Sequence, residues 1–99
     1  MPEYLVLMHN DRQTDSGNPD DWLSYIDRLV KAGVMRGGSA IGNGQSYRKA
    51  AAAAPITTSI DGYLKITAES LEAATAILAG NPTFEAGGTV EIRELPETD

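Results

Sequence analysis

The length of 99 residues fits a single domain, and 41% hydrophobic residues can supply one core, so we expect one domain over residues 1–99. The absence of Cys excludes a disulfide framework, a thiolate metal site and a cysteine nucleophile, and a single His cannot form a zinc site. The net charge of −6 opposes binding to nucleic acid or anionic lipid. The sequence opens without a basic leader and no apolar stretch approaches about 18 residues, so we expect a cytoplasmic protein that does not bind membranes.

The first predicted element is a strand over residues 4–9, because this short run is apolar up to His9 and a turn-rich stretch follows it. A continuous apolar run indicates a central strand that is covered on both faces. A helix is expected next, capped by Asn18, with Pro19 at its first position and Gly33 at its end. Its predicted apolar stripe consists of Trp22, Leu23, Ile26, Leu29 and Val30.

The middle of the chain carries weaker signals. Residues 34–41 favour a strand that Gly37 and Gly38 interrupt, and a glycine-rich turn follows. Residues 45–54 contain five consecutive alanines, which are too few to hold a helix alone, so we expect an irregular or mobile excursion. A short strand over residues 56–60 is expected to lead into the next element.

The last third of the chain predicts a strand over residues 63–67, a helix of about ten residues and a strand over residues 89–95. Ser70, or alternatively Thr67, is the expected helix cap. The residues expected to face inward are Leu64, Ile66, Leu71, Ala74, Ile77, Leu78, Val90 and Ile92. The opposite sheet face is expected to carry Tyr63, Lys65, Glu91 and Arg93.

This order of elements predicts an α+β protein of ferredoxin-like type, a split βαβ repeat with a four-stranded antiparallel sheet and both helices on one face. Such a sheet leaves its other face uncovered in a monomer. Because the strand over residues 4–9 is apolar on both sides, we expect a second copy of the chain to cover part of that face. The predicted partner is therefore another copy, in a homodimer.

The sequence contains no complete cofactor-binding motif. The spacing from Gly37 to Gly42 is that of a phosphate-binding loop, but the required Lys and Ser or Thr are absent. The run that begins at Gly42 as a dinucleotide motif has Tyr47 where the last glycine belongs, and a hairpin turn explains it better. We therefore expect no cofactor. No basic strand carries an aromatic pair of the RNA-binding type, so we also expect no nucleic-acid partner.

His9 is the one side chain suited to general base or ligand-donor chemistry near neutral pH. A strand-end His that bonds only to backbone or water is the alternative. Its phase with Leu5 and Leu7 favours the helix-covered side of the sheet, whereas its place at the strand end could let it reach the open side. The sequence leaves its direction open.

Four further residues are candidates for substrate binding. Tyr63, Lys65 and Arg93 could together bind a small anionic or phenolic ligand, although with Glu91 they could equally form cross-strand pairs on a solvated face. Trp22, in the first helical turn, could contact a ligand, although its apolar neighbours favour packing in the core or at an interface.

The order and spacing of short segments along nearly the whole chain are distinctive: residues 4–9, residues 22–33 followed by Gly37-Gly38, residues 62–66 and 70–74, Asn81-Pro82 and residues 88–93. Together they resemble the YCII-related and DGPF-domain family. The resemblance implies a dimeric α+β barrel built from ferredoxin-like chains. It also implies a small acid-base enzyme or binding protein whose pocket lies between sheet and helix.

Both signatures of that family are incomplete here. In the YCII branch a His eleven residues before the helix-ending Gly pairs with an Asp after the second helix, whereas this chain has Trp22 and Asn81 at those positions. The Asp-Gly-Pro-Phe segment of the other branch is reduced to Asp61-Gly62 followed by Tyr63. We therefore expect no His-Asp acid-base dyad.

Two functions from different classes remain open. One is a small-molecule-binding or interaction protein that acts as a non-catalytic dimer. The alternative is a lyase- or isomerase-type enzyme that acts on an organic acid or phenolic substrate through His9, with Lys65 or Arg93 as its partner.

Overall fold

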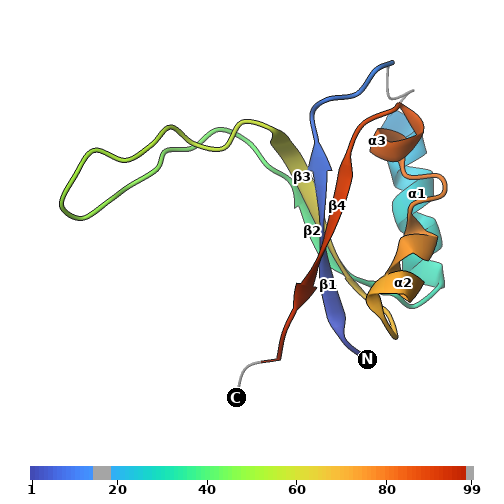
Figure 1. Ribbon diagram of the computed structural model, residues 1–99. Helices are drawn as coiled ribbons and strands as arrows, with labels where there is room; N and C mark the ends of the chain where they lie inside the picture. The colour runs from blue at the N-terminus through green and yellow to red at the C-terminus, as the bar shows by residue number, and fades with distance from the viewer. Residues whose placement is uncertain (15–18, 98–99) are drawn as a thin grey trace.

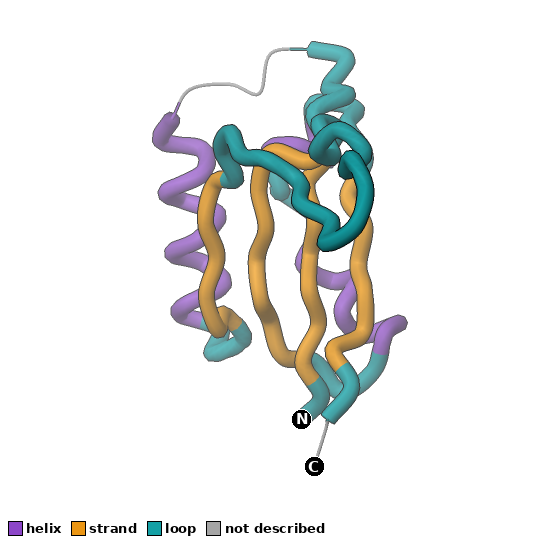
Figure 2. The backbone as a smooth tube through the Cα atoms, turned by 90° about the vertical axis from the view of Figure 1, so that its left-hand side faces the viewer, coloured by secondary structure: helices purple, strands orange, loops and turns teal. Residues whose placement is uncertain are grey.

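The computed structural model describes residues 1–14 and 19–97. Its elements in chain order are β1 (Glu3–His9), α1 (Pro19–Lys31), β2 (Met35–Ala40), β3 (Ile60–Thr67), α2 (Leu71–Ala74), the 3₁₀ helix η1 (Thr75–Ile77), α3 (Pro82–Glu85) and β4 (Val90–Leu95). The strands form one antiparallel sheet in the order β2-β3-β1-β4. All helices cover one face of this sheet, and Figures 1 and 2 show the other face bare. The predicted ferredoxin-like α+β fold is confirmed.

Strand register decides which side of β1 faces the helices. Val6 pairs with Leu64 on β3 and with Ile92 on β4, and these three side chains share the helix-covered face. The buried residues of β1 are accordingly Tyr4, Val6 and Met8. His9 shares the phase of Leu5 and Leu7, as expected, but this phase lies on the bare side of the sheet and not on the helix-covered side that the leucines favoured in the sequence. The bare side is here called the open face, and its residues on β1, β3 and β4 are Glu3, Leu5, Leu7, His9, Tyr63, Lys65, Thr67, Glu91, Arg93 and Leu95.

Helix α1 begins at Pro19 and its predicted cap, Asn18, lies outside the described residues. The chain leaves the helix at Gly33, whose φ of 77° is a left-handed conformation suited to glycine, as predicted. The buried stripe differs from the prediction, because Leu23 and Val30 are 69% and 56% exposed. Tyr25 takes part in the core instead, at 3% exposure. It follows Trp22 at i+3 and therefore lies on the same helix face.

The helix predicted after β3 is broken into shorter pieces. Ser70 is its cap, as expected, since Oγ of Ser70 accepts a hydrogen bond from the backbone N–H of Ala73. Leu71, predicted to face inward, is 45% exposed. The α-helix ends at Ala74 and the 3₁₀ turn η1 follows it. Beyond that point side chains of α1 hold the segment: the carbonyl of Ile77 accepts from the Tyr25 hydroxyl, and that of Ala79 accepts from the Arg28 guanidinium.

Residues 41–59, here called the arm, join β2 to β3 without helix or strand. The irregular excursion predicted around the alanine run is confirmed, but the strand predicted over residues 56–60 is wrong except for Ile60. Next to the last pair of β1 and β3, the carbonyl of Ser59 accepts a hydrogen bond from the backbone N–H of Asn10. Figures 1 and 2 show the arm projecting from the sheet on the side away from the helices.

Candidate functional site

A pocket of about 450 Å³ lies between α1 and the β2–β3 half of the sheet, and is here called the helix-side pocket. Its apolar wall comes from both layers, with Trp22 and Ile26 on the helix and Met8 and Leu64 on the sheet. The remaining lining residues are Arg12, Met35, Gly38, Ser39, Ala40, Asp61, Gly62 and Tyr63. Small-molecule sites are concave, largely apolar and roughly 300–1,000 Å³ in volume, so this pocket has the dimensions of one.

Glycine at position 38 brings β2 close to β3 below this pocket. A Cβ atom there would lie 2.7 Å from Cδ2 of Leu64 and 2.8 Å from the carbonyl oxygen of Tyr63. Both distances are too short for carbon in van der Waals contact, and one neighbour is backbone that cannot turn aside. The glycine that weakened the strand signal in the sequence is therefore required by packing at the pocket.

Aromatic contacts fix the position of Trp22 at the pocket wall. The ring centroids of Trp22 and Tyr25 lie 5.8 Å apart at an interplanar angle of 79°, an edge-to-face pair. Tyr25 is itself held by its hydroxyl, which donates to the carbonyl of Ile77, and by the Arg28 guanidinium over its ring. Burial raises the pKa of the Tyr25 phenol, with the Asn81 amide and Arg28 acting in the opposite direction. The phenol is therefore a neutral donor at pH 7.

Charged groups of the helix-side pocket come from the loop after β1 and from the start of β3. Nη1 of Arg12 donates to Oδ2 of Asp61 over 3.2 Å, and both side chains are about one third exposed. A guanidinium has five N–H donors, so Arg12 can bind a further acceptor while it keeps Asp61. Neither residue was predicted as part of a site: Asp61 was considered only as a remnant of the Asp-Gly-Pro-Phe segment, and Arg12 carries no sequence signal of its own.

On the open face, Glu91 forms the centre of a polar cluster with His9 and Arg93. Nε2 of His9 lies 3.0 Å from Oε1 of Glu91, and Oε2 of Glu91 accepts from Nη1 of Arg93 over 3.1 Å. The His9 imidazole is the main cause, and the Arg93 guanidinium the second, of a lowered pKa for the Glu91 carboxyl. The carboxylate orients the imidazole, as in sites where a His acts as base.

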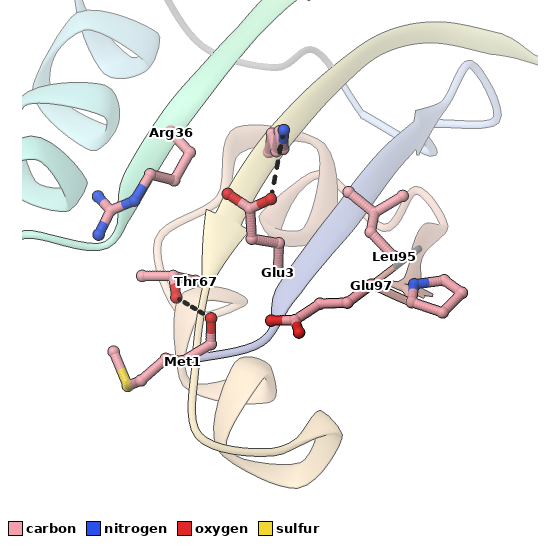
Figure 3. A pocket seen from close by; sticks show the side chains of 8 residues that line it. Met1, Glu3, Arg36, Thr67, Leu95 and Glu97 are labelled. Atoms are coloured by element: carbon pink, nitrogen blue, oxygen red, sulfur yellow. Dashed lines mark hydrogen bonds and ion pairs between the residues drawn. The ribbon is translucent and has the colours of Figure 1, made fainter. Parts of the chain in front are cut away.

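Lys65 lies further along the open face, at the opposite end of β1. Nζ of Lys65 lies 3.3 Å from Oε1 of Glu3. Both residues line a second pocket of about 560 Å³, where Arg36 and Glu97 add charges of both signs. Figure 3 shows Glu3, Arg36 and Glu97 around it. Oγ1 of Thr67 donates there to the carbonyl of Met1 over 3.4 Å. Because the charges are mixed, this pocket selects no single class of ligand.

The structure separates the predicted site residues into two groups. Trp22 lies on the helix side of the sheet, whereas His9, Lys65 and Arg93 lie on the open face. Tyr63 belongs to β3, which forms the floor of the helix-side pocket, and it pairs with Leu7 across the open face. Sequence alternation could assign residues to the two faces of the sheet, but it could not show that the apolar pocket would form on the helix-covered face.

Asn81, which the resemblance compares with an Asp of the YCII branch, serves a structural purpose here. It is fully buried, and its Oδ1 accepts a hydrogen bond from the backbone N–H of Phe84 over 3.0 Å, capping α3. It does not line the helix-side pocket. Trp22 and Asn81 therefore do not reproduce a shared site with new side chains.

Comparisons with known proteins identify no family: no family model matches the chain, and a search of curated proteins finds no match. Within residues 1–14 and 19–97, no helix is long and apolar enough to cross a bilayer. The same residues contain no group of three His, Cys, Asp or Glu side chains placed to hold a metal ion.

Proposed function

We propose that this protein binds a small organic molecule in the helix-side pocket, as a homodimeric relative of the YCII-related and DGPF-domain proteins that lacks their His-Asp dyad. The observation that carries the proposal is the pocket of about 450 Å³, which places the ring of Trp22 opposite apolar side chains of the sheet. A flat aromatic or phenolic ring fits between such walls.

Arg12 suggests the charge of the ligand. It is the cationic residue that lines the helix-side pocket, and its guanidinium has donors beyond the one bonded to Asp61. A carboxylate or phenolate at the pocket mouth would take these donors in a charge-assisted hydrogen bond. The proposed ligand is therefore a small phenolic or aromatic acid, which keeps the anionic or phenolic class expected from the sequence but binds at Arg12 rather than at Lys65 and Arg93.

Trp22 supplies a direct test, because it is the only tryptophan in the chain. Titration with 4-hydroxybenzoate should change its fluorescence and raise the melting temperature, since a ligand that binds only the folded state stabilises it by mass action. Arg12→Gln should weaken binding of 4-hydroxybenzoate about tenfold, equal to about 1.4 kcal/mol, while leaving the uncharged probe 4-methylphenol unaffected.

The matched control is Leu23→Ala, which changes an exposed residue of α1 beside Trp22 but outside the pocket. It should bind both probes as the natural protein does. Unchanged fluorescence and melting temperature with millimolar concentrations of both probes would reject the proposed site.

The homodimer is proposed to form through the open face. Leu5 and Leu7 place apolar side chains there on the central strand, and no element of the described chain covers them. A second sheet packed on this face would bury about 1,200–2,000 Å², the standard size of a stable interface. Sedimentation at tens of micromolar should give the mass of two chains, and Leu7→Glu should give the mass of one, because it places a charge in the interface.

A second candidate function is acid-base catalysis by His9 on an organic acid or phenolic substrate. It is favoured by the 3.0 Å contact between His9 and Glu91, which fixes the direction of the imidazole. Such an activity should show a pH-rate limb near an imidazole pKa that disappears in His9→Ala. Turnover that survives His9→Ala but is lost in Trp22→Ala would move the reaction to the helix-side pocket.

A further inference from the structure

The arm, residues 41–59, places a large part of the chain outside the body of the molecule. It leaves the sheet after β2, extends on the open-face side and returns to β3 (Figures 1 and 2). The radius of gyration is consequently 15.0 Å. A compact domain of this length has a radius of gyration of about 13 Å.

The arm has little support from its own chain. Among the described residues, its backbone is bonded to the body only at the root, from Ile41 to Asp61 and from Asn10 to Ser59 and Thr58. No hydrogen bond within the described structure reaches residues 45–57. Ordering an extended segment costs about 1–2 kcal/mol per residue, and contacts must offset that cost. A fixed arm therefore needs a surface outside its own chain.

The composition of the arm indicates the kind of surface. Tyr47 is 83% exposed, and the alanine run adds further small apolar side chains. Arg48 and Lys49 are its only charged residues, so the arm carries +2 while the rest of the chain carries −8. The arm is thus suited to an acidic surface with apolar patches, and the body of this same protein is acidic.

We propose that the arm of each chain grips the body of a second copy, with Arg48 and Lys49 against its acidic residues. This inference rests on the proposed homodimer and names the segment that holds it together. It follows from direction and length, because the arm points to the side on which the second sheet would pack. Packed sheets lie about 10 Å apart, whereas each leg of the arm, roughly nine residues, can span about 30 Å. The arm therefore reaches past the second sheet to its helix layer.

The helix layer presents the complementary charge. Its exposed acidic residues outnumber the basic residues Arg28 and Lys31 of α1, and they are Asp20, Asp21 and Asp27 on α1, Glu69 and Glu72 around the start of α2 and Glu85 on α3. Twofold symmetry repeats any such contact, so two arms would grip two bodies with identical interactions. One chain thus contains both halves of the contact, and no other protein is required.

The first test measures the dimer dissociation constant by sedimentation for charge reversals in the arm. Arg48→Glu and Lys49→Glu should each raise it about tenfold at 50 mM salt, with a smaller effect at 500 mM because salt screens exposed charges. The matched control keeps the charge at the same positions: Arg48→Lys and Lys49→Arg should each change the constant less than about twofold, because a contact between exposed charges depends mainly on their sign.

The second test removes the arm. Replacing residues 43–59 with Asn-Gly joins β2 to β3 through a two-residue turn of the type that suits antiparallel strands. This variant should remain folded by circular dichroism and sediment as a monomer where the natural protein is a dimer. If it fails to fold, Tyr47→Ala in the full chain decides the question, with an expected rise of about tenfold in the dissociation constant.

The outcomes separate the two proposals. A natural protein that is monomeric at tens of micromolar overturns both the dimer and the role of the arm. Dimers that are lost in Leu7→Glu but unchanged in every arm variant leave the dimer standing and overturn the inference about the arm. Retention of the natural protein on heparin at 150 mM salt, abolished by Arg48→Glu, would also overturn it, because the arm would then recognise a polyanion.

Discussion

The hydroxyl of Tyr25 donates a hydrogen bond to the carbonyl oxygen of Ile77 over 2.6 Å, and this bond joins α1 to η1 across the core. Both residues are buried, at 3% and 7% exposure. In a longer helix, this carbonyl would have accepted a hydrogen bond from a backbone N–H of the same helix. The bond therefore ties the end of the second helical segment to the helix that forms the pocket wall.

Tyr25→Phe should lower the free energy of unfolding by about 1–3 kcal/mol, because the buried carbonyl of Ile77 loses its partner while the ring stays. Chemical denaturation measures this difference. Leu23→Ala on the exposed side of α1 should change stability by less than about 0.5 kcal/mol. Equal effects from the two substitutions would contradict a special role for the hydroxyl.

Gly38→Ala should destabilise the protein by about 1–3 kcal/mol, because the added Cβ would meet Leu64 and the backbone of Tyr63 at less than 3 Å. Gly42→Ala is the matched control, since a Cβ on this arm glycine meets nothing within 4 Å. It should be neutral within about 0.5 kcal/mol. Thermal unfolding of both variants checks the contrast, and a neutral Gly38→Ala would show that β2 can move away from β3.

Thr83→Val should leave stability unchanged or raise it by up to about 1 kcal/mol. Thr83 is fully buried and its Oγ1 has no hydrogen-bond partner among the described residues. Desolvation of the hydroxyl therefore costs free energy that no hydrogen bond offsets. A marked loss of stability in Thr83→Val would indicate a buried water that forms a hydrogen bond with the hydroxyl.

Asn81→Ala should lower the free energy of unfolding by about 1–2 kcal/mol, since the cap of α3 is lost.

Glu91 should make folding sensitive to mild acid. Its folded-state pKa lies below the ordinary value, so the unfolded chain binds a proton first as the pH falls. The stabilisation from Glu91 is therefore present above the ordinary carboxyl pKa and is lost as the pH falls through the folded-state pKa. Glu91→Gln should flatten the loss of unfolding free energy from about pH 5 to pH 3, measured by denaturation at several pH values.

The control for this pH dependence is Glu94→Gln, on the same strand but without an ion pair in the described structure. It should keep the acid sensitivity of the natural protein. A Glu91→Gln profile that matches the natural one would show that His9 and Arg93 contribute nothing to stability through this carboxylate.

The order of the four sheet strands and of the helices α1 and α2 was predictable because these elements carry local signals, whereas α3 was not predicted. Alternation placed Leu64 and Ile66 on one face of β3, and both are buried. Gly33 ended α1 and Ser70 capped α2, as their backbone chemistry requires. Such signals extend over a few residues, so the sequence alone determines them.

The candidate site was less predictable, because its parts meet across long stretches of chain. Arg12 and Asp61 are 49 residues apart, and Tyr25 and Ile77 are 52 apart. No local pattern reports such a contact. A tyrosine on a helix gives the same periodic signal whether its hydroxyl finds a buried carbonyl or faces water, and only the packing of α1 on η1 selects the first.

The sequence by itself determined the strands, the first helix, their order and the acidic charge of this protein. Only the tertiary structure decided which side of β1 faces the helices, and with it the direction of His9. The reason is that residues 4–8 are apolar at every position, so no alternation of apolar and polar residues shows which side of the strand faces the core. The pairing of Val6 with Leu64 and Ile92 places Val6 on the helix-covered side, and His9 therefore points toward Glu91 on the open face.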